Sequence, residues 1–246
     1  RAAVEGALEA TFEAWRLLRS GGAPVMGVFS APSLFATNLS TDGDWDQAGQ
    51  QARERAREHA LHWERVLWDP WLRALADGEV AWPWRAPVNR PDLAGAFDLV
   101  GLVADHPMAV DAAGNPGPYP SGARVDATQS APLPEEIGVM LRRVHDRLGG
   151  RDLVVAGWGV STTDDDWRDE LLRDVVAQVE SAAGDGVPVI GLFHDALLDG
   201  YATAGWTTIP GFDGPRGLVI RDRRLKGSGR WLSEHITGRP APASLS

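Results

Sequence analysis

Ionisable side chains follow two of the apolar segments in this chain of 246 residues. Asp105 and His106 come directly after a run that ends at Ala104, and His194 and Asp195 come after a run that ends in phenylalanine. Because the carboxyl ends of parallel strands meet at one edge of a sheet, we expect both pairs at the same edge. Two carboxylates there, each beside an imidazole that tunes its charge, have the composition of a general acid–base pair.

Two other interpretations of these four residues stay open. In the first, the polar groups only satisfy one another at the rim of the sheet and have no catalytic role. In the second, the imidazoles and carboxylates hold a metal ion. No ligand spacing specifies such a site, so we predict no metal and no cofactor.

Four short, continuous apolar runs predict the strands that position these side chains. The predicted strands cover residues 25–29, 97–104, 153–156 and 187–193. Helical patterns cover residues 2–19, 46–76, 134–148, 167–183 and 228–237, with a break at Asp69-Pro70 because proline clashes with the preceding turn. Strands that alternate with helices predict an α/β fold with a parallel sheet covered on both faces. Four such units amount to half of an eight-stranded (β/α) barrel.

Several local signals refine this prediction. One apolar helical face is marked by Val4, Leu8, Phe12 and Trp15. Residues 31–46 and 107–132 are rich in turn-forming residues and are predicted to be loops. The three aspartates at 164–166 have the position of a solvated helix cap, which is a better interpretation than a cation site.

The composition excludes several function classes. A net charge of −10 argues against nucleic-acid binding, which needs clustered cations. The chain has no cysteine, and no apolar run reaches the length of a membrane span, so we expect a cytoplasmic protein with no membrane contact. The first residue, Arg1, lies inside a helical pattern, which is typical of a fragment, a processed chain or a trimmed one.

Segments spread over residues 2–236 resemble glycoside hydrolase family 1, the β-glucosidase type. The segment 186–199, Gly-Val-Pro-Val-Ile-Gly-Leu-Phe-His-Asp-Ala-Leu-Leu-Asp, is similar to the family's Gly-Val-x-Val-x-Gly-Tyr-x-x-Trp-Ser-Leu-Leu-Asp. Arg216-Gly217-Leu218-Val219, with Asp222 and Lys226, resembles its closing Arg-Phe-Gly-Leu segment. The run from Phe97 resembles the family's sixth strand, and the run around Asp69-Pro70 is a weak match by itself. The resemblance implies the carboxyl-terminal half of a TIM (β/α)8 barrel, strands 5–8.

The departures from the family pattern lie where its chemistry would be. The seventh strand, Asp152-Leu-Val-Val-Ala-Gly-Trp-Gly159, carries Gly157 in place of the family's nucleophilic Glu and Trp158 in place of Asn. Asp195-Ala196 replaces Trp-Ser, and Ala202 replaces the Glu that grips sugar hydroxyls. Retaining hydrolysis needs two carboxyl groups about 5–5.5 Å apart. The resemblance therefore implies a pseudoenzyme candidate, or an enzyme whose site is rebuilt around Asp105 and Asp195. An inverting pair tolerates about 6.5–9.5 Å between its carboxyl groups.

The expected ligand is a carbohydrate or small glycoside. His106 and His194 are predicted to contact it at the barrel mouth, and Trp158 and Trp206 either stack on it or only fill space. The alternative function is a non-catalytic structural or interaction subunit whose pocket Trp158 plugs. We expect Asp199, which matches the family, to tie down a loop.

The domain prediction is one partial barrel over residues 1–237 and a flexible tail over residues 238–246. Four strands leave an open sheet edge with unpaired backbone groups. We therefore expect the missing amino-terminal barrel half, a partner chain or self-association to close it.

Overall fold

The computed structural model describes residues 1–30, 34–36, 47–104, 107–117, 119, 122–201, 213–220 and 222–240. Its centre is a parallel sheet of four strands in the order β1-β5-β7-β8. The strands are β1 (Met26–Ser30), β5 (Leu99–Val103), β7 (Leu153–Trp158) and β8 (Val189–His194). Met26 pairs with Leu99, and Leu153 pairs with both Val100 and Val189. All four predicted strands are confirmed, with ends that differ by a few residues.

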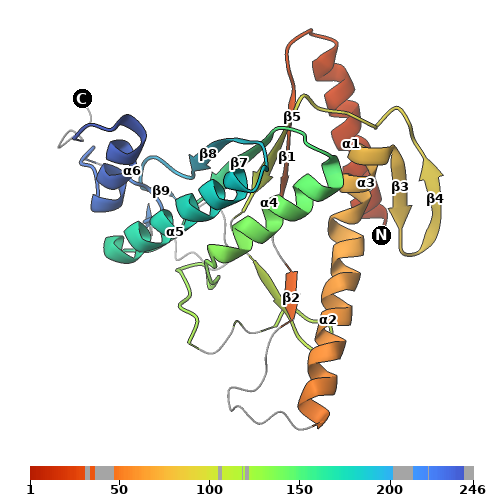
Figure 1. Ribbon diagram of the computed structural model, residues 1–246, viewed down its shortest axis with the longest axis horizontal. Coiled ribbons are helices and arrows are strands. Elements are labelled where there is room, and N and C mark those ends of the chain that lie inside the picture. The colour runs from red at the N-terminus through yellow and green to blue at the C-terminus, as the bar shows by residue number, and fades with distance from the viewer. Residues whose placement is uncertain are drawn as a thin grey trace.

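Helices connect the strands in the predicted alternation. They are α1 (Ala2–Arg19), α2 (Gln47–Leu67), α3 (Asp69–Asp77), α4 (Glu135–Leu148), α5 (Asp165–Gly184) and α6 (Gly227–Thr237). The predicted break is confirmed, because α2 ends at Leu67 and Pro70 stands in the first turn of α3. Figure 1 shows α4 and α5 side by side across one face of the sheet, with α6 beyond α5 at the carboxyl-terminal end.

Short strand pairs add to the predicted pattern. β2 (Leu34–Ala36) pairs in parallel with β6 (Met108–Val110), which brings together two segments predicted to be loops. β3 (Glu79–Trp82) and β4 (Arg85–Asn89) form an antiparallel hairpin, and the two-residue strands β9 (Gly200–Tyr201) and β10 (Asp213–Gly214) pair antiparallel. The prediction that residues 31–46 and 107–132 are entirely loop is therefore wrong, because three-residue strands are too short to show a periodic pattern.

The two faces of the sheet differ in burial. Val100, Leu102 and Val155 are buried in the core against the helices, together with Leu8 and Phe12 of the predicted apolar face of α1. On the other face, Met26 and Val28 are exposed. In the described residues, helices thus cover one face, whereas both were expected to be covered. The open face is the one that would line the inside of a closed barrel.

Candidate functional site

The carboxyl ends of three strands meet at one edge of the sheet. Gly157 of β7 pairs with Val103 of β5, and Trp158 pairs with His194 of β8. The next residue, Asp195, donates its backbone N–H to the carbonyl oxygen of Trp158 at 2.8 Å. The structure therefore brings together Trp158, His194 and Asp195, as the sequence predicted.

Gly157 is buried, and the chain around it leaves room for a Cβ atom. A Cβ atom built on this glycine would meet its nearest heavy atoms, the Val103 methyl groups, at 3.9 Å and the Asp195 Cβ atom at 4.0 Å. These are ordinary van der Waals distances, so a methyl group would fit at this position. We call this space the Gly157 slot. At this position β7 contributes no side chain, because glycine has none.

Asp195 presents a fixed but accessible carboxylate next to the slot. Its side chain is 58% exposed, and the Arg216 guanidinium Nε lies 3.3 Å from Oδ2. The same Nε donates to the Asp195 backbone carbonyl at 2.9 Å. The peptide bond that follows, to Ala196, is cis. Asp195 can therefore accept hydrogen bonds from a molecule at this edge of the sheet.

His194, the residue before Asp195, is a neutral side chain. Burial lowers the pKa of His194 to about 4, helped by the positive charges of Arg168 and Arg216. Its Nδ1 lies 3.2 Å from the carbonyl oxygen of Ala196, which accepts the Nδ1 proton. The other nitrogen, Nε2, is buried and has no hydrogen-bond partner among the described residues. At neutral pH, His194 adds no positive charge beside Asp195.

Trp158 is a packed side chain. It is 2% exposed, and its ring meets the His194 ring edge-on with 5.9 Å between the centroids. An indole that stacks on a ligand must present a free face. The burial of Trp158 therefore favours the space-filling interpretation over the stacking one.

The other predicted site residues, Asp105, His106 and Trp206, lie outside the described residues, as does Ala202. Within the described ranges, no group of three or more His, Asp or Glu side chains is arranged to hold a metal ion. The described helices include none long and apolar enough to cross a membrane.

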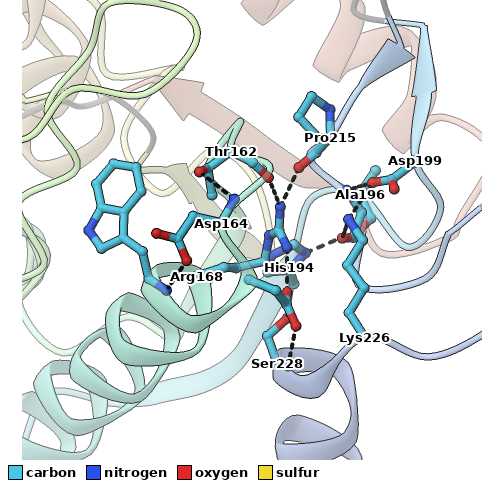
Figure 2. Close-up of polar contacts among 12 residues, drawn as sticks. Thr162, Asp164, Arg168, His194, Ala196, Asp199, Pro215, Lys226 and Ser228 are labelled. Atoms are coloured by element: carbon cyan, nitrogen blue, oxygen red, sulfur yellow. Dashed lines mark hydrogen bonds and ion pairs between the residues drawn. The ribbon is translucent and has the colours of Figure 1, made fainter.

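A buried arginine holds together segments next to the site, and the sequence patterns did not predict it. Arg168 of α5 is fully buried, and its guanidinium donates to the carbonyl oxygens of Thr162 and Pro215 and to the carboxylate of Asp165 (Figure 2). Asp165 also accepts a hydrogen bond from the Ser228 hydroxyl at 2.7 Å. Arg168 thus joins the segment after β7 to the start of α6. The spacing of Asp165 and Arg168, three residues apart at a helix start, was the available signal.

Asp199 has the structural role that the sequence predicted. Its Oδ1 accepts hydrogen bonds from the Gly217 backbone N–H at 2.8 Å and from the Lys226 ammonium at 2.7 Å. Figure 2 shows Lys226 reaching Asp199 from the segment before α6. The predicted helix cap is confirmed too, because Asp164 accepts from the Trp167 backbone N–H at 3.1 Å. The two neighbouring aspartates are not both solvated, since Asp165 is tied to Arg168 and Ser228.

Known structures give this arrangement a fold-level context. No protein-family profile and no curated protein matches the chain. Among solved structures, a family 1 β-glucosidase from Thermotoga maritima with glucoimidazole has a TM-score of 0.74 and 19% identity over 98% of this chain and 57% of its own. The same enzyme with isofagomine lactam has a TM-score of 0.73. A β-glycosidase from Pyrococcus horikoshii has a TM-score of 0.65 and 21% identity over 89% of this chain and 49% of its own.

The chain spans about half the length of these structures. The parallel sheet, its order and its connecting helices agree with their (β/α) architecture. The chain has the α/β fold of a family 1 β-glucosidase TIM barrel over about half of that barrel.

Proposed function

We propose that the protein binds a carbohydrate or small glycoside at the carboxyl edge of its sheet, with the Asp195 carboxylate accepting hydrogen bonds from sugar hydroxyls. The observation that carries the proposal is the exposed carboxylate, fixed by Arg216, next to the Gly157 slot. Solved structures of the Thermotoga maritima enzyme hold the inhibitors isofagomine lactam and glucoimidazole, and this chain shares their fold.

The proposal excludes a covalent sugar ester on β7. A retaining mechanism needs a nucleophilic carboxylate and a second carboxyl group about 5–5.5 Å away. Gly157 offers no nucleophile, because it has no side chain. If the protein hydrolyses glycosides, Asp195 takes the base role and Asp105 the acid role of an inverting pair.

Calorimetric titration with a panel of β-glycosides and iminosugar inhibitors tests the binding proposal. Asp195→Asn should weaken binding by about tenfold or more, because it removes a charged hydrogen-bond partner. The matched control is Asp222→Asn, an exposed aspartate that pairs with Arg224 on the surface. Equal affinity of the wild type and Asp195→Asn would refute the role of Asp195.

Hydrolysis of aryl glycosides separates a binder from an enzyme. We expect no turnover by the complete natural protein. Turnover that disappears in both Asp105→Asn and Asp195→Asn would replace the binding proposal by the inverting pair.

A second function, a structural or interaction subunit, is favoured by the burial of Trp158. In that case, the barrel centre is plugged and no sugar enters. An unchanged tryptophan fluorescence spectrum across the whole sugar panel would support this alternative, whereas a saturable change supports binding.

We also infer that another set of strands covers the open face of the sheet in the working protein. β1 and β8 are edge strands, and Met26, Val28 and Phe193 are exposed. The solved β-glucosidases contain further chain beyond the part that this chain matches. The missing half of the barrel, from the same polypeptide or from a partner, is the cover that fits this face.

A further inference from the structure

We propose that Arg216 is a positioning residue that fixes the Asp195 carboxylate beside the Gly157 slot, and that the fold holds Arg216 in place from both sides. The proposal deepens the proposed function, because it assigns the group that orients the sugar-binding carboxylate. Neither the acid–base interpretation nor the family resemblance gave Arg216 this role.

The contact between the two residues engages backbone and side chain together. Arg216 Nε donates to the Asp195 carbonyl at 2.9 Å and lies 3.3 Å from its carboxylate. Gly159 makes room for this contact, since a Cβ atom there would stand 1.8 Å from the Asp195 carbonyl oxygen and 3.1 Å from Arg216 Nε. One guanidinium nitrogen thus contacts both groups: its single N–H donates to the backbone carbonyl after β8, and its positive charge attracts the carboxylate.

The residue before Arg216 is held by the buried guanidinium. The Pro215 carbonyl oxygen accepts a hydrogen bond from Arg168, which also binds the Thr162 carbonyl at the end of the β7 segment (Figure 2). Arg168 is fully buried, so this anchor is shielded from water. The start of the segment that carries Arg216 is therefore tied to the segment after β7.

The residue after Arg216 is held by an ion pair. Gly217 donates its N–H to Asp199 at 2.8 Å, and its carbonyl accepts from Lys226 at 2.7 Å. A Cβ atom on Gly217 would lie 2.3 Å from the Asp199 nitrogen, so the two backbones pack closer than a side chain permits. With Pro215 and Gly217 both held, the backbone that carries Arg216 is fixed on both sides.

Folding stability does not account for the ion pair between the two side chains. The Asp195 side chain is more than half exposed, and an exposed ion pair contributes little to folding. A preorganised carboxylate, in contrast, binds a ligand without first losing rotamer freedom. The buried anchors around an exposed pair are what a binding site needs.

A double-mutant cycle on sugar binding tests the proposal. Titrations with the glycoside panel compare wild type, Asp195→Asn, Arg216→Gln and the double variant. We expect Arg216→Gln to weaken binding by about tenfold, and the double variant to bind no more weakly than Asp195→Asn. Arg216→Lys should restore part of the loss. The matched control is Arg224→Gln on the same segment, whose exposed partner is Asp222; it should leave binding unchanged. Additive losses would overturn the proposal, because Arg216 would then act on the ligand independently of Asp195.

Carbon-13 relaxation of the Asp195 carboxyl group tests the same proposal without a ligand. In the wild type, this carboxyl should be more ordered than that of Asp222, and Arg216→Gln should remove the difference while Arg224→Gln does not. An Asp195 carboxyl that is equally ordered in wild type and Arg216→Gln would overturn the proposal. Failure of the proposed function looks different, since the wild type would then bind no sugar while the relaxation difference remained.

Discussion

The Cβ atom of Asp195 lies 4.0 Å from the point at which a Cβ atom on Gly157 would stand. Two strand ends thus face the same small volume, one with no side chain and the other with a carboxylate. The acidic group at this edge belongs to the segment after β8, not to β7. It pairs with Arg216, which comes from a later part of the chain.

Substitution by alanine should have very different effects on stability at two glycines, one on β7 and one just after it. A Cβ atom on Gly157 would make only ordinary contacts and φ is not positive, so Gly157→Ala should change the free energy of unfolding by less than about 1 kcal/mol. At Gly159, a Cβ atom would collide with the Asp195 carbonyl at 1.8 Å, so Gly159→Ala should destabilise by about 3 kcal/mol or more. Urea unfolding of both variants measures the difference. Similar stabilities would show that the backbone at Asp195 yields easily.

No covalent sugar ester should form on β7. A fluorinated activated glycoside traps the ester of a retaining enzyme, and intact-mass spectrometry detects the added mass. We expect none on any residue between Leu153 and Ser161 in the natural protein, because none of them is a carboxylate. A glycosyl adduct located by peptide mapping in that range would refute the proposed function.

The elements of the fold were largely predictable because their patterns are local. The four strands are continuous apolar runs, and α1, α4 and α5 have clear periodicity or caps. The β3–β4 hairpin was missed, since β4 is exposed along its whole length and has no buried face to create a pattern. The open face of the sheet was also missed, because the same apolar sequence suits a face covered by helices or by other strands.

The site was predictable in part. Strand order alone brings His194 and Asp195 to the end of β7. Arg216 and Arg168 were not assigned to the site, because their contacts join segments far apart in the sequence: 21 residues separate Arg216 from Asp195, and 47 separate Arg168 from Pro215. The burial of Trp158 depends on packing against His194, which no single-strand pattern reveals.

Arg168→Met should destabilise the protein strongly. The buried guanidinium binds two carbonyl oxygens and Asp165, and its removal leaves a half-buried carboxylate without its cation. We expect a loss of about 3–5 kcal/mol in the free energy of unfolding. Arg173→Met is the control on the same helix: its pair with Asp169 is partly exposed, and it also lies over the Trp231 ring. That variant should lose less than about 1 kcal/mol in chemical denaturation. Equal losses would contradict the anchoring role of Arg168.

The free energy of unfolding should decrease as the pH is lowered from the unfolded-state pKa of His194 to its folded-state pKa. Burial lowers the folded-state pKa of His194 to about 4 from its ordinary value of 6.5, so the unfolded chain binds more protons in this window. The stabilisation is complete above pH 6.5 and is lost progressively down to about pH 4, by at most about 3 kcal/mol. Urea unfolding at a series of pH values measures the slope. His194→Asn keeps a donor for Ala196 and should flatten the slope, whereas the exposed His62→Asn should not; an unchanged slope in His194→Asn would contradict the assignment.

The chain of residues 1–246 should not remain a monodisperse monomer when it is produced alone. Among the described residues, β1 and β8 are the edge strands of the four-stranded sheet, and the face between them exposes Met26 and Val28. Such edges and apolar faces associate with other chains. Light scattering after size-exclusion chromatography should therefore show oligomers or aggregates.

Replacement of Met26 and Val28 by threonine, which retains strand propensity, should shift the population toward monomer. The matched control is Val88→Thr on the exposed hairpin strand β4, away from the sheet, and it should not shift it. A stable monomer of the unaltered chain, with its sheet edges free, would show that the exposed face needs no cover.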